Sequence, residues 1–401
     1  MTTKKLKMSK NSLLKKRSSI KNFKNYSRIK NQLRNLLFKK RFLVRLNHNP
    51  KSFTLKSGLV ASKPFQTQDD LIIERLKKFY ILCNANFEGN KESGWSDIFL
   101  QLQGEIHSAF RDGDNEKIND ILRNPGNYNL FYGFENLCRD LIKNKRLEDI
   151  LEPEMVMDSL LSLCEAVGVS TMSNPESLKI SKAISAESAI QLLENEFGFK
   201  ICFPNPFEGE YGIETTKGII SYRATQAVYQ AWKISRIIKD KPNPSILEIG
   251  GGLGRTAYYC KYFGIYDYTI VDIPISSIAQ GNFLGRVLPQ NDLILLGESN
   301  DAEEVKIKLI SPNAFFSSDK KYDLIVNVDS ITELDINIAK QYLRKIEAVS
   351  DFFLSINHEF NSFTINSIWK ETPGLNKLYR NPYWLRRGYV EELFEKMDKT
   401  I

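Results

Sequence analysis

The first 68 residues contain no aspartate or glutamate, although they carry 19 lysines and arginines. The whole chain of 401 residues has 56 basic and 48 acidic side chains and a formal net charge of +8. Subtracting the first 68 residues from these totals leaves 37 basic and 48 acidic residues, a charge of −11. This asymmetry indicates an anionic partner for a basic arm at residues 1–68 rather than for the rest of the chain.

Within the basic arm, apolar residues recur near helical spacing between lysines and arginines. This pattern is typical of an amphipathic helix that lies on an anionic membrane surface, so we expect peripheral contact of the arm with such a membrane. A solvated, partly disordered tail and a targeting segment remain alternatives. No nucleic acid is expected, because base-stacking or groove-reading residues are not evident. The apolar residues are Leu14, Ile20, Phe23, Tyr26, Ile29, Leu33, Leu36 and Leu37.

Cysteine and histidine are scarce. The five cysteines are scattered, odd in number and without CxxC spacing, which argues against a disulfide framework and against a zinc site. The three histidines exclude a histidine-rich metal centre. No apolar run approaches the ~20 residues that span a bilayer, and no signal peptide is evident. These absences predict a cytoplasmic protein, peripheral at most to the inner face of the membrane.

The length of the chain favours two or three domains. We predict the basic arm at 1–68, a helical N-terminal domain at 69–210 and an α/β domain at 211–401. In the helical domain, Asp114 is expected to cap a short helix that ends at Asn124-Pro125-Gly126. The other helices are expected at Leu71–Phe79, Trp95–Ile106, 133–143, 154–166 and 186–195.

Residues 211–401 alternate strand-like apolar runs with helical patterns. Such alternation predicts right-handed βαβ units and a doubly wound, mostly parallel sheet that is covered on both faces. A long helix is expected from about Gly218 to Lys239. The expected strands are Ser245–Ile249, Tyr268–Val271, Leu293–Leu296, Leu324–Val328 and Phe352–Ile356, and the helices between them lie near 253–263, 275–287, 300–310 and 336–348.

A glycine-rich turn follows the first of these strands, with glycines at 250, 252 and 254 and a helix after them. Ligands of such sheets bind at this point, against backbone N–H groups at the start of the helix. Dinucleotide enzymes need a third glycine at 255, where this chain has Arg255. Glu248, near the strand end, would repel a pyrophosphate but hold an ammonium group. The turn therefore favours S-adenosylmethionine over a dinucleotide.

Two further acids follow later strands. Asp272 closes the second strand and can accept bonds from both ribose hydroxyls, although a capping role at the helix near Pro274 is the alternative. Glu298 follows the third strand and either borders the adenine or sits in a surface turn. Arg223, on the helix before the first strand, either meets the cofactor carboxylate or is a surface arginine.

The run Ile246–Arg255 followed by Asp272 resembles motifs I and II of class I methyltransferases, which have a Rossmann-like fold. Over about residues 70–398 the chain is similar to the sugar O-methyltransferases of bacterial surface-polysaccharide gene clusters. The resemblance implies transfer of a methyl group from S-adenosylmethionine to a sugar or glycan hydroxyl. The stretches that carry the resemblance are Tyr229–Trp232, Asp329–Leu334, Leu354–Glu359 and Tyr383–Tyr389. Only about 45 residues follow the fifth strand, which is short for the two further strands and the helix usual in this class.

Methyl transfer to an alcohol needs a general base near the acceptor hydroxyl. His358, after the fifth strand, is the first candidate, and Glu359 and Asp329 are the alternatives. Asp329, Glu333 and Asp335 suggest a divalent cation, but acids are also normal where a helix begins, so a cation is not favoured and no metal ligand is assigned.

An aromatic and basic cluster near the C-terminus offers faces that stack on sugars and guanidinium groups that bind carboxylate or phosphate. A place in the core is the alternative for Trp384 and Tyr389. The substrate candidates in this cluster are Tyr383, Trp384, Arg386 and Arg387. Two other functions remain open: a nicotinamide-dependent sugar oxidoreductase, and a non-catalytic methyltransferase-like scaffold.

Overall fold

The structure is a computed structural model that describes residues 53–54, 58–63, 70–84, 101–132, 153–172, 183–298 and 306–397. Most of the predicted basic arm, the start of the predicted helix at Trp95–Ile106 and the whole predicted helix at 133–143 lie outside the described residues.

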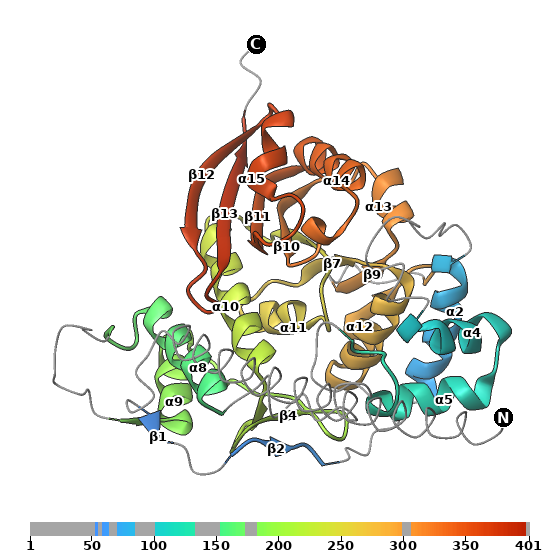
Figure 1. The fold of residues 1–401 in the computed structure, drawn as a ribbon, viewed down its shortest axis with the longest axis horizontal. Helices are drawn as coiled ribbons and strands as arrows, with labels where there is room; N and C mark the ends of the chain where they lie inside the picture. The colour runs from blue at the N-terminus through green and yellow to red at the C-terminus, as the bar shows by residue number, and fades with distance from the viewer. Residues whose placement is uncertain are drawn as a thin grey trace, which may run out of the picture. The chain divides into compact units, whose positions relative to one another are not determined.

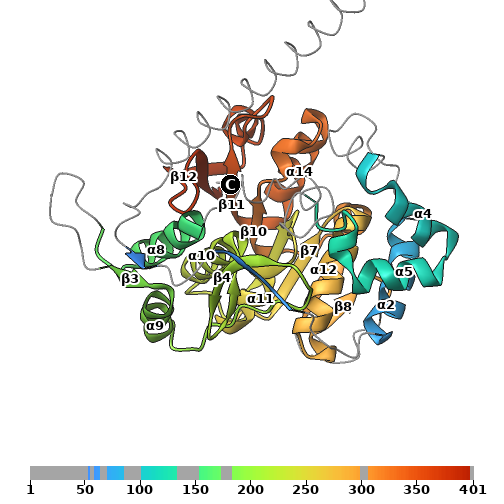
Figure 2. The same cartoon turned by 60° about the horizontal axis from the view of Figure 1, so that its bottom comes forward.

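An eight-stranded sheet forms the centre of the described structure (Figures 1 and 2). Six strands are parallel, and only β13 and β12 at one edge run antiparallel to their neighbours. The strand order reverses beside β6, the strand that precedes the glycine-rich turn. In spatial order the strands are β12 (Leu375–Pro382), β13 (Tyr389–Lys396), β11 (Ser350–His358), β10 (Tyr322–Val328), β6 (Ser245–Ile249), β7 (Asp267–Val271), β9 (Ile307–Ile310) and β8 (Leu293–Leu295).

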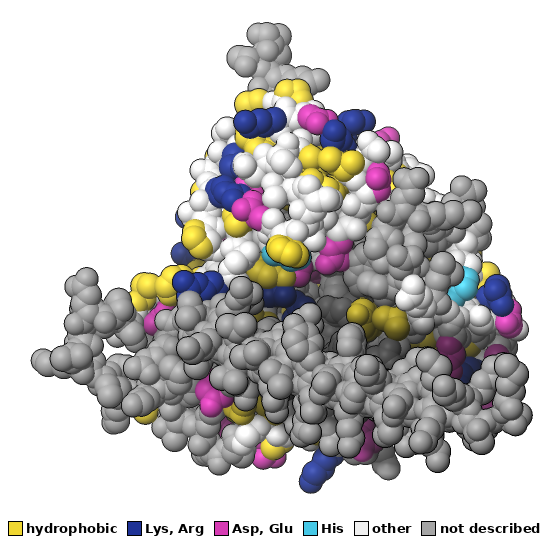
Figure 3. Space-filling model, viewed as in Figure 1, with side chains coloured by type: hydrophobic (Ala, Val, Ile, Leu, Met, Phe, Trp, Pro, Cys, Tyr) yellow, Lys and Arg dark blue, Asp and Glu magenta, His cyan; other side chains and the backbone are white. Residues whose placement is uncertain are grey.

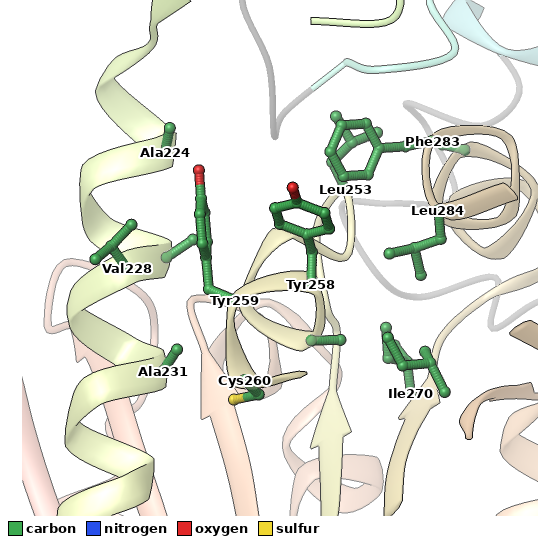
Figure 4. Close-up of a cluster of buried hydrophobic side chains, with 14 of the residues drawn as sticks. Ala224, Val228, Ala231, Leu253, Tyr258, Tyr259, Cys260, Ile270, Phe283 and Leu284 are labelled. Atoms are coloured by element: carbon green, nitrogen blue, oxygen red, sulfur yellow. The ribbon is translucent and has the colours of Figure 1, made fainter. Parts of the chain in front are cut away.

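The alternation of side chains along the strands separates two buried layers. Along β6, Ile246 belongs to the larger hydrophobic cluster and Leu247 to the smaller one. The larger cluster joins the sheet to α10 (Tyr222–Ile237), α11 (Arg255–Tyr262) and α12 (Pro274–Val287). Figure 4 shows Tyr258 and Tyr259 of α11 between α10 and α12. The smaller cluster joins the opposite face to α13 (Pro312–Ser317), α14 (Ile336–Val349) and α15 (Ile365–Ile368).

The predicted doubly wound, mostly parallel sheet with helices on both faces is therefore confirmed. All five predicted strands are present, and the bounds of the first agree with the prediction. The predicted helices near 253–263, 275–287 and 336–348 correspond to α11, α12 and α14.

Two helix predictions were wrong in part. The helix expected from Gly218 starts at Tyr222, because Gly218–Ile220 forms β5, which pairs with β4 (Tyr211–Thr215). Ser221 then caps α10 by accepting a hydrogen bond from the Ala224 N–H. The second is the helix expected at 300–310. The structure describes only its last residues, and these form strand β9, which pairs with both β7 and β8.

Both of the further strands usual in this class are present after β11, as β12 and β13, although the C-terminal stretch is short. Between β11 and β12 the chain makes only the single turn of α15 and a 3-10 turn at Trp369–Glu371. A hairpin then brings β13 back between β12 and β11. The sheet is complete because the intervening helix is reduced to about one turn.

Helices from the N-terminal half pack against those of the sheet. α2 (Asp70–Asn84) lies against α12, where Cβ atoms on Gly281 and Gly285 would stand within 2.5 Å of Leu76 and Ile72. One hydrophobic cluster includes residues on both sides of position 210, and all described residues fall within one compact unit, His48–Ile401. The other helices of this half are α4 (Gly104–Asp112), α5 (Asn115–Arg123), α8 (Pro153–Val167) and α9 (Ala186–Phe197).

Local signals in this half agree with the sequence. The Asp114 side chain caps α5 by accepting a hydrogen bond from the Lys117 N–H at 3.0 Å. The chain turns at Pro125–Asn127, as the Asn-Pro-Gly run predicts. Two short strand pairs complete this half. β1 (Phe53–Thr54) pairs with β3 (Ile184–Ser185), and β2 (Val60–Ala61) pairs with β4.

Among the helices that the structure describes, none is both long enough and apolar enough to cross a membrane.

Candidate active site

The turn between β6 and α11 requires glycine for two separate reasons. Gly250, Gly252 and Gly254 all have positive φ, at 75°, 55° and 83°, where other residues are strained. A Cβ atom on Gly250 would also stand 2.2 Å from the Ser330 Oγ. The Gly250 N–H donates to the Val271 carbonyl at 2.9 Å, which fixes the turn to β7. The half-buried turn is therefore strained for any other residue and closely packed against Ser330.

Glu248 lies in β6 directly beneath this turn and is only 2% exposed. The Tyr268 hydroxyl donates to its Oε2 at 3.0 Å. Burial raises the pKa of Glu248 to about 8. A carboxylate in such a place gains most from a cationic partner, since burial without one disfavours its charged form.

Asp272 follows β7, the neighbouring strand. The Ile273 N–H donates to Oδ1 at 2.8 Å, and Gln280 Nε2 donates to Oδ2 at 2.6 Å. The N-cap of α12 is Ile273 and receives no side-chain cap, so the structure does not support the capping role considered for Asp272. Burial raises the pKa of this carboxyl to about 7. Gln280, which the sequence did not single out, holds Asp272 at the strand end.

Glu298 and Arg223 lie elsewhere. Arg75 of α2 binds both oxygens of Glu298 at 2.7 Å, and β8, which precedes Glu298, is separated from β7 by β9. The surface-turn reading of Glu298 thus fits better than contact with adenine. Arg223 lies in the first turn of α10, and its charge acts on the Tyr389 hydroxyl of β13, whose pKa burial raises.

Asp329 follows β10 and has φ = 54°, an unusual backbone conformation for a residue other than glycine. Its Oδ2 accepts from the Tyr389 hydroxyl at 2.7 Å and from Arg386 Nη1 at 3.2 Å. Its Oδ1 is buried and has no hydrogen-bond donor among the described residues. Strain and an unused buried acceptor at one residue are typical of a functional site.

A buried polar network joins the ends of β10 and β11 to the end of β6, where the glycine-rich turn begins. Asn327 Nδ2 and the Ser330 Oγ both donate to the Ile249 carbonyl, at 3.0 and 2.9 Å. Asn357 Nδ2 from β11 donates to Asn327 Oδ1 at 3.0 Å. Residues after β10 and β11 are thereby held next to the turn after β6, so the two halves of the candidate site form one assembly.

His358, at the end of β11, faces Asp329. The distance from His358 Nε2 to Asp329 Oδ1 is 3.4 Å. The Phe360 N–H donates to His358 Nδ1 at 3.2 Å, which assigns the ring proton to Nε2 when the imidazole is neutral. The structure therefore brings together two of the three candidate bases.

Glu359, the third candidate, turns away. It binds Arg380 of β12 at 2.6 Å in a half-exposed ion pair. Figure 3 shows lysines and arginines next to acidic side chains in the upper part of the face that it draws. Glu359 is therefore part of the surface charge pattern.

Three residues could hold a metal ion. One ligand atom each from Asp329, Glu333 and His358 lies within 4.8 Å of the others. Asp335 does not join them, because its side chain caps α14 by accepting from the Asn337 N–H at 2.8 Å. Two observations weigh against a cation: Arg386 already binds Asp329, and the His358 nitrogen nearest to Asp329 carries the proton.

The C-terminal aromatic and basic cluster divides. Tyr383 is buried and packs against Tyr229 with ring centroids 5.4 Å apart, so it lies in the core rather than on a surface open to a substrate. Trp384 is half-buried and packs on the larger hydrophobic cluster, and Arg387 is exposed. Arg386 lies 3.8 Å from the Tyr389 ring and reaches Asp329. Tyr389 belongs to the predicted cluster but was not among the substrate candidates, and its place opposite His358 in the β11–β13 pairing is not visible in the sequence.

No protein-family model matches the chain, and no curated protein matches it.

Solved structures do match, at low identity. The mitomycin 7-O-methyltransferase MmcR is 14% identical, with 44% of this chain and 56% of that chain covered and a TM-score of 0.32. The glycopeptide N-methyltransferase MtfA in complex with sinefungin is 13% identical, with 43% and 94% covered and a TM-score of 0.32. The magnesium protoporphyrin IX methyltransferase ChlM from Synechocystis PCC 6803 with bound SAM is 12% identical, with 43% and 82% covered and a TM-score of 0.31.

The fold itself rests on the sheet. Parallel strands on both sides of β6, an antiparallel β13 inserted between β11 and β12, and a glycine-rich turn after β6 are all present. The chain has a Rossmann-like, doubly wound α/β fold.

Proposed function

We propose that the protein is an S-adenosylmethionine-dependent methyltransferase. The observation that carries this proposal is the pair of carboxyl groups at the ends of the adjacent strands β6 and β7, the buried Glu248 and the partly buried Asp272. An ammonium group bound through Glu248 and a ribose bound through Asp272 would satisfy both. A pyrophosphate at the same turn would offer Glu248 no cation and would be repelled by either group in its ionised form.

The acceptor that we propose is a hydroxyl group of a sugar or glycan, as in the modification of a bacterial capsule or lipopolysaccharide. In this reaction the hydroxyl oxygen attacks the methyl carbon in line, and the bond from that carbon to sulfur breaks. The sulfur keeps the bonding electrons and becomes a neutral thioether, and the hydroxyl proton passes to a base. The Asp329–His358 pair supports this acceptor because it lies beside the turn and offers a place for that proton.

Within the pair, we propose that Asp329 Oδ1 receives the proton directly. Nδ1 of His358 accepts from Phe360, so its lone pair is occupied, and Nε2 carries a proton toward Asp329. Arg386 and Tyr389 hold the other carboxylate oxygen, which fixes the direction in which Oδ1 points. The Nε2–H group of His358, 3.4 Å from Oδ1, then stabilises the carboxylate electrostatically without a hydrogen bond to it.

The decisive experiment is calorimetric titration of the protein with S-adenosylhomocysteine, with and without Mg²⁺. We expect binding in the micromolar range that is lost in Asp272→Ala and is unchanged by Mg²⁺. Glu298→Ala is the matched control, since it removes an acid at the sheet edge. No binding under either condition would overturn the proposal, and tight NADH binding in its place would favour a nicotinamide-dependent oxidoreductase.

A further inference from the structure

Arg255 occupies the position where a dinucleotide-binding turn would have its third glycine. It is the first residue of α11, directly after Gly254, and its side chain is 5% exposed. The guanidinium group lies 4.8 Å above the Phe283 ring of α12. A buried positive charge therefore stands at the turn that we propose to hold a cationic cofactor.

Glu210 compensates this charge. Arg255 Nη2 donates to Glu210 Oε1 at 2.5 Å, and the Glu210 side chain is 4% exposed. Since the pair is almost completely buried, the loss of one charged partner would change the electrostatic balance around the other in a medium of low dielectric constant.

Glu210 is in turn fixed by a segment far away in the sequence. The Ser62 N–H donates to the Glu210 carbonyl at 2.8 Å, and the Glu210 N–H donates to the Ser62 Oγ at 2.9 Å. The Ser62 hydroxyl also donates to the Phe207 carbonyl at 2.6 Å. Residues 62, 210 and 255 therefore form one connected chain of contacts that ends at the glycine-rich turn.

We propose that Glu210 is a positioning residue of the cofactor site that also sets its charge. It holds Arg255, and with it the start of α11, in place, and it cancels a positive charge that would repel the sulfonium group of S-adenosylmethionine. This inference rests on the proposed function. It adds that the preference for the cationic donor over its neutral product, S-adenosylhomocysteine, depends on Glu210.

The two parts of the role give different results in binding measurements on the full chain. Glu210→Gln keeps the size and a hydrogen-bond acceptor but removes the charge. Loss of a unit charge near the ligand, in a medium of effective dielectric constant ~20, changes the affinity for a cation roughly tenfold. We expect Glu210→Gln to weaken S-adenosylmethionine binding about tenfold more than S-adenosylhomocysteine binding. Ser62→Ala removes hydrogen bonds but no charge and should weaken both ligands equally.

Two further variants complete the test. Glu194→Gln is the matched control, because Glu194 of α9 is also buried and paired with lysines but does not contact the turn. If Glu210→Gln unfolds, Glu210→Gln combined with Arg255→Met removes both charges and should restore the wild-type ratio of the two affinities. Wild-type protein that binds neither ligand would overturn the proposed function itself. Wild-type binding with an unchanged ratio in Glu210→Gln would overturn this inference alone.

Discussion

At Glu248 and Asp272 the fold keeps two carboxyl groups where burial raises their pKa values, to about 8 and about 7. In the unfolded chain both groups would ionise near their ordinary values of about 4. Between about pH 4 and pH 8 the folded state without ligand therefore binds more protons than the unfolded state. Its stability falls as the pH rises through this window, the reverse of what a salt-bridged carboxylate causes.

The pH dependence of stability and that of ligand affinity should therefore run in opposite directions. Urea unfolding should show the free protein losing stability between about pH 5 and pH 8, and Asp272→Asn should flatten the slope. The affinity for S-adenosylhomocysteine should rise over the upper half of the same range, because the carboxylates must ionise to accept bonds from the ligand. An affinity independent of pH would show that neither group changes its charge on binding.

Asp329 and His358 give a second prediction at the scale of the residue. Asp329→Asn should reduce the catalytic rate about 10²-fold or more, because it removes the proton acceptor, whereas His358→Gln should cost roughly tenfold. The assay is transfer of radiolabelled methyl groups from S-adenosylmethionine to a panel of nucleotide sugars and glycan extracts. Cofactor affinity should change little in both variants.

Glu359→Gln serves as the control, since Glu359 pairs with Arg380 at the surface. If His358→Gln proved to be the more damaging of the two, the imidazole would be the base and the assignment to Asp329 would be wrong.

The glycine-rich turn allows a prediction at the scale of the element. Gly250→Ala combines strained backbone, at φ = 75°, with a Cβ atom 2.2 Å from the Ser330 Oγ. Backbone strain alone costs about 1–3 kcal/mol of the free energy of unfolding, and displacement of Ser330 should abolish binding of S-adenosylhomocysteine.

Gly264→Ala separates these two causes. Gly264 has φ = 79°, but a Cβ atom there would meet nothing within 4 Å. Gly264→Ala should therefore lose a similar amount of stability from backbone strain in thermal unfolding, while calorimetry should show normal binding of S-adenosylhomocysteine. Equal loss of binding in both variants would mean that strain, not the contact with Ser330, is decisive.

The basic arm belongs to the scale of the whole molecule. Residues 1–68 carry 19 basic and no acidic side chains, and the remainder is net acidic. We expect the full chain to bind vesicles that contain anionic lipid, with an affinity that falls steeply as salt is added. A variant that begins at Ser52 should not bind them but should keep its affinity for S-adenosylhomocysteine. Binding that persists without the arm, or in high salt, would argue against this role.

The sequence alone was enough to predict those elements whose pattern lies within a short stretch of the chain. The βαβ alternation predicted the parallel sheet, and the run from Ile246 to Arg255 predicted the turn, because glycine spacing and hydrophobic period are local properties. The helix expected at 300–310 failed in its described part for the opposite reason. Ile307 and Leu309 suit either a helix or a strand, and only pairing with β7 and β8 decides for the strand.

Tertiary structure alone decided which side chains meet. Asp329 and His358 follow neighbouring strands, which the sequence could suggest, but Tyr389 and Arg386 reach Asp329 only because the C-terminal hairpin runs back along β11. The contact of Ser62 with Glu210, and of Glu210 with Arg255, joins positions far apart in the chain. Such pairs depend on how whole elements pack, so the sequence by itself determined the turn and its acids, while packing determined how charge is arranged around them.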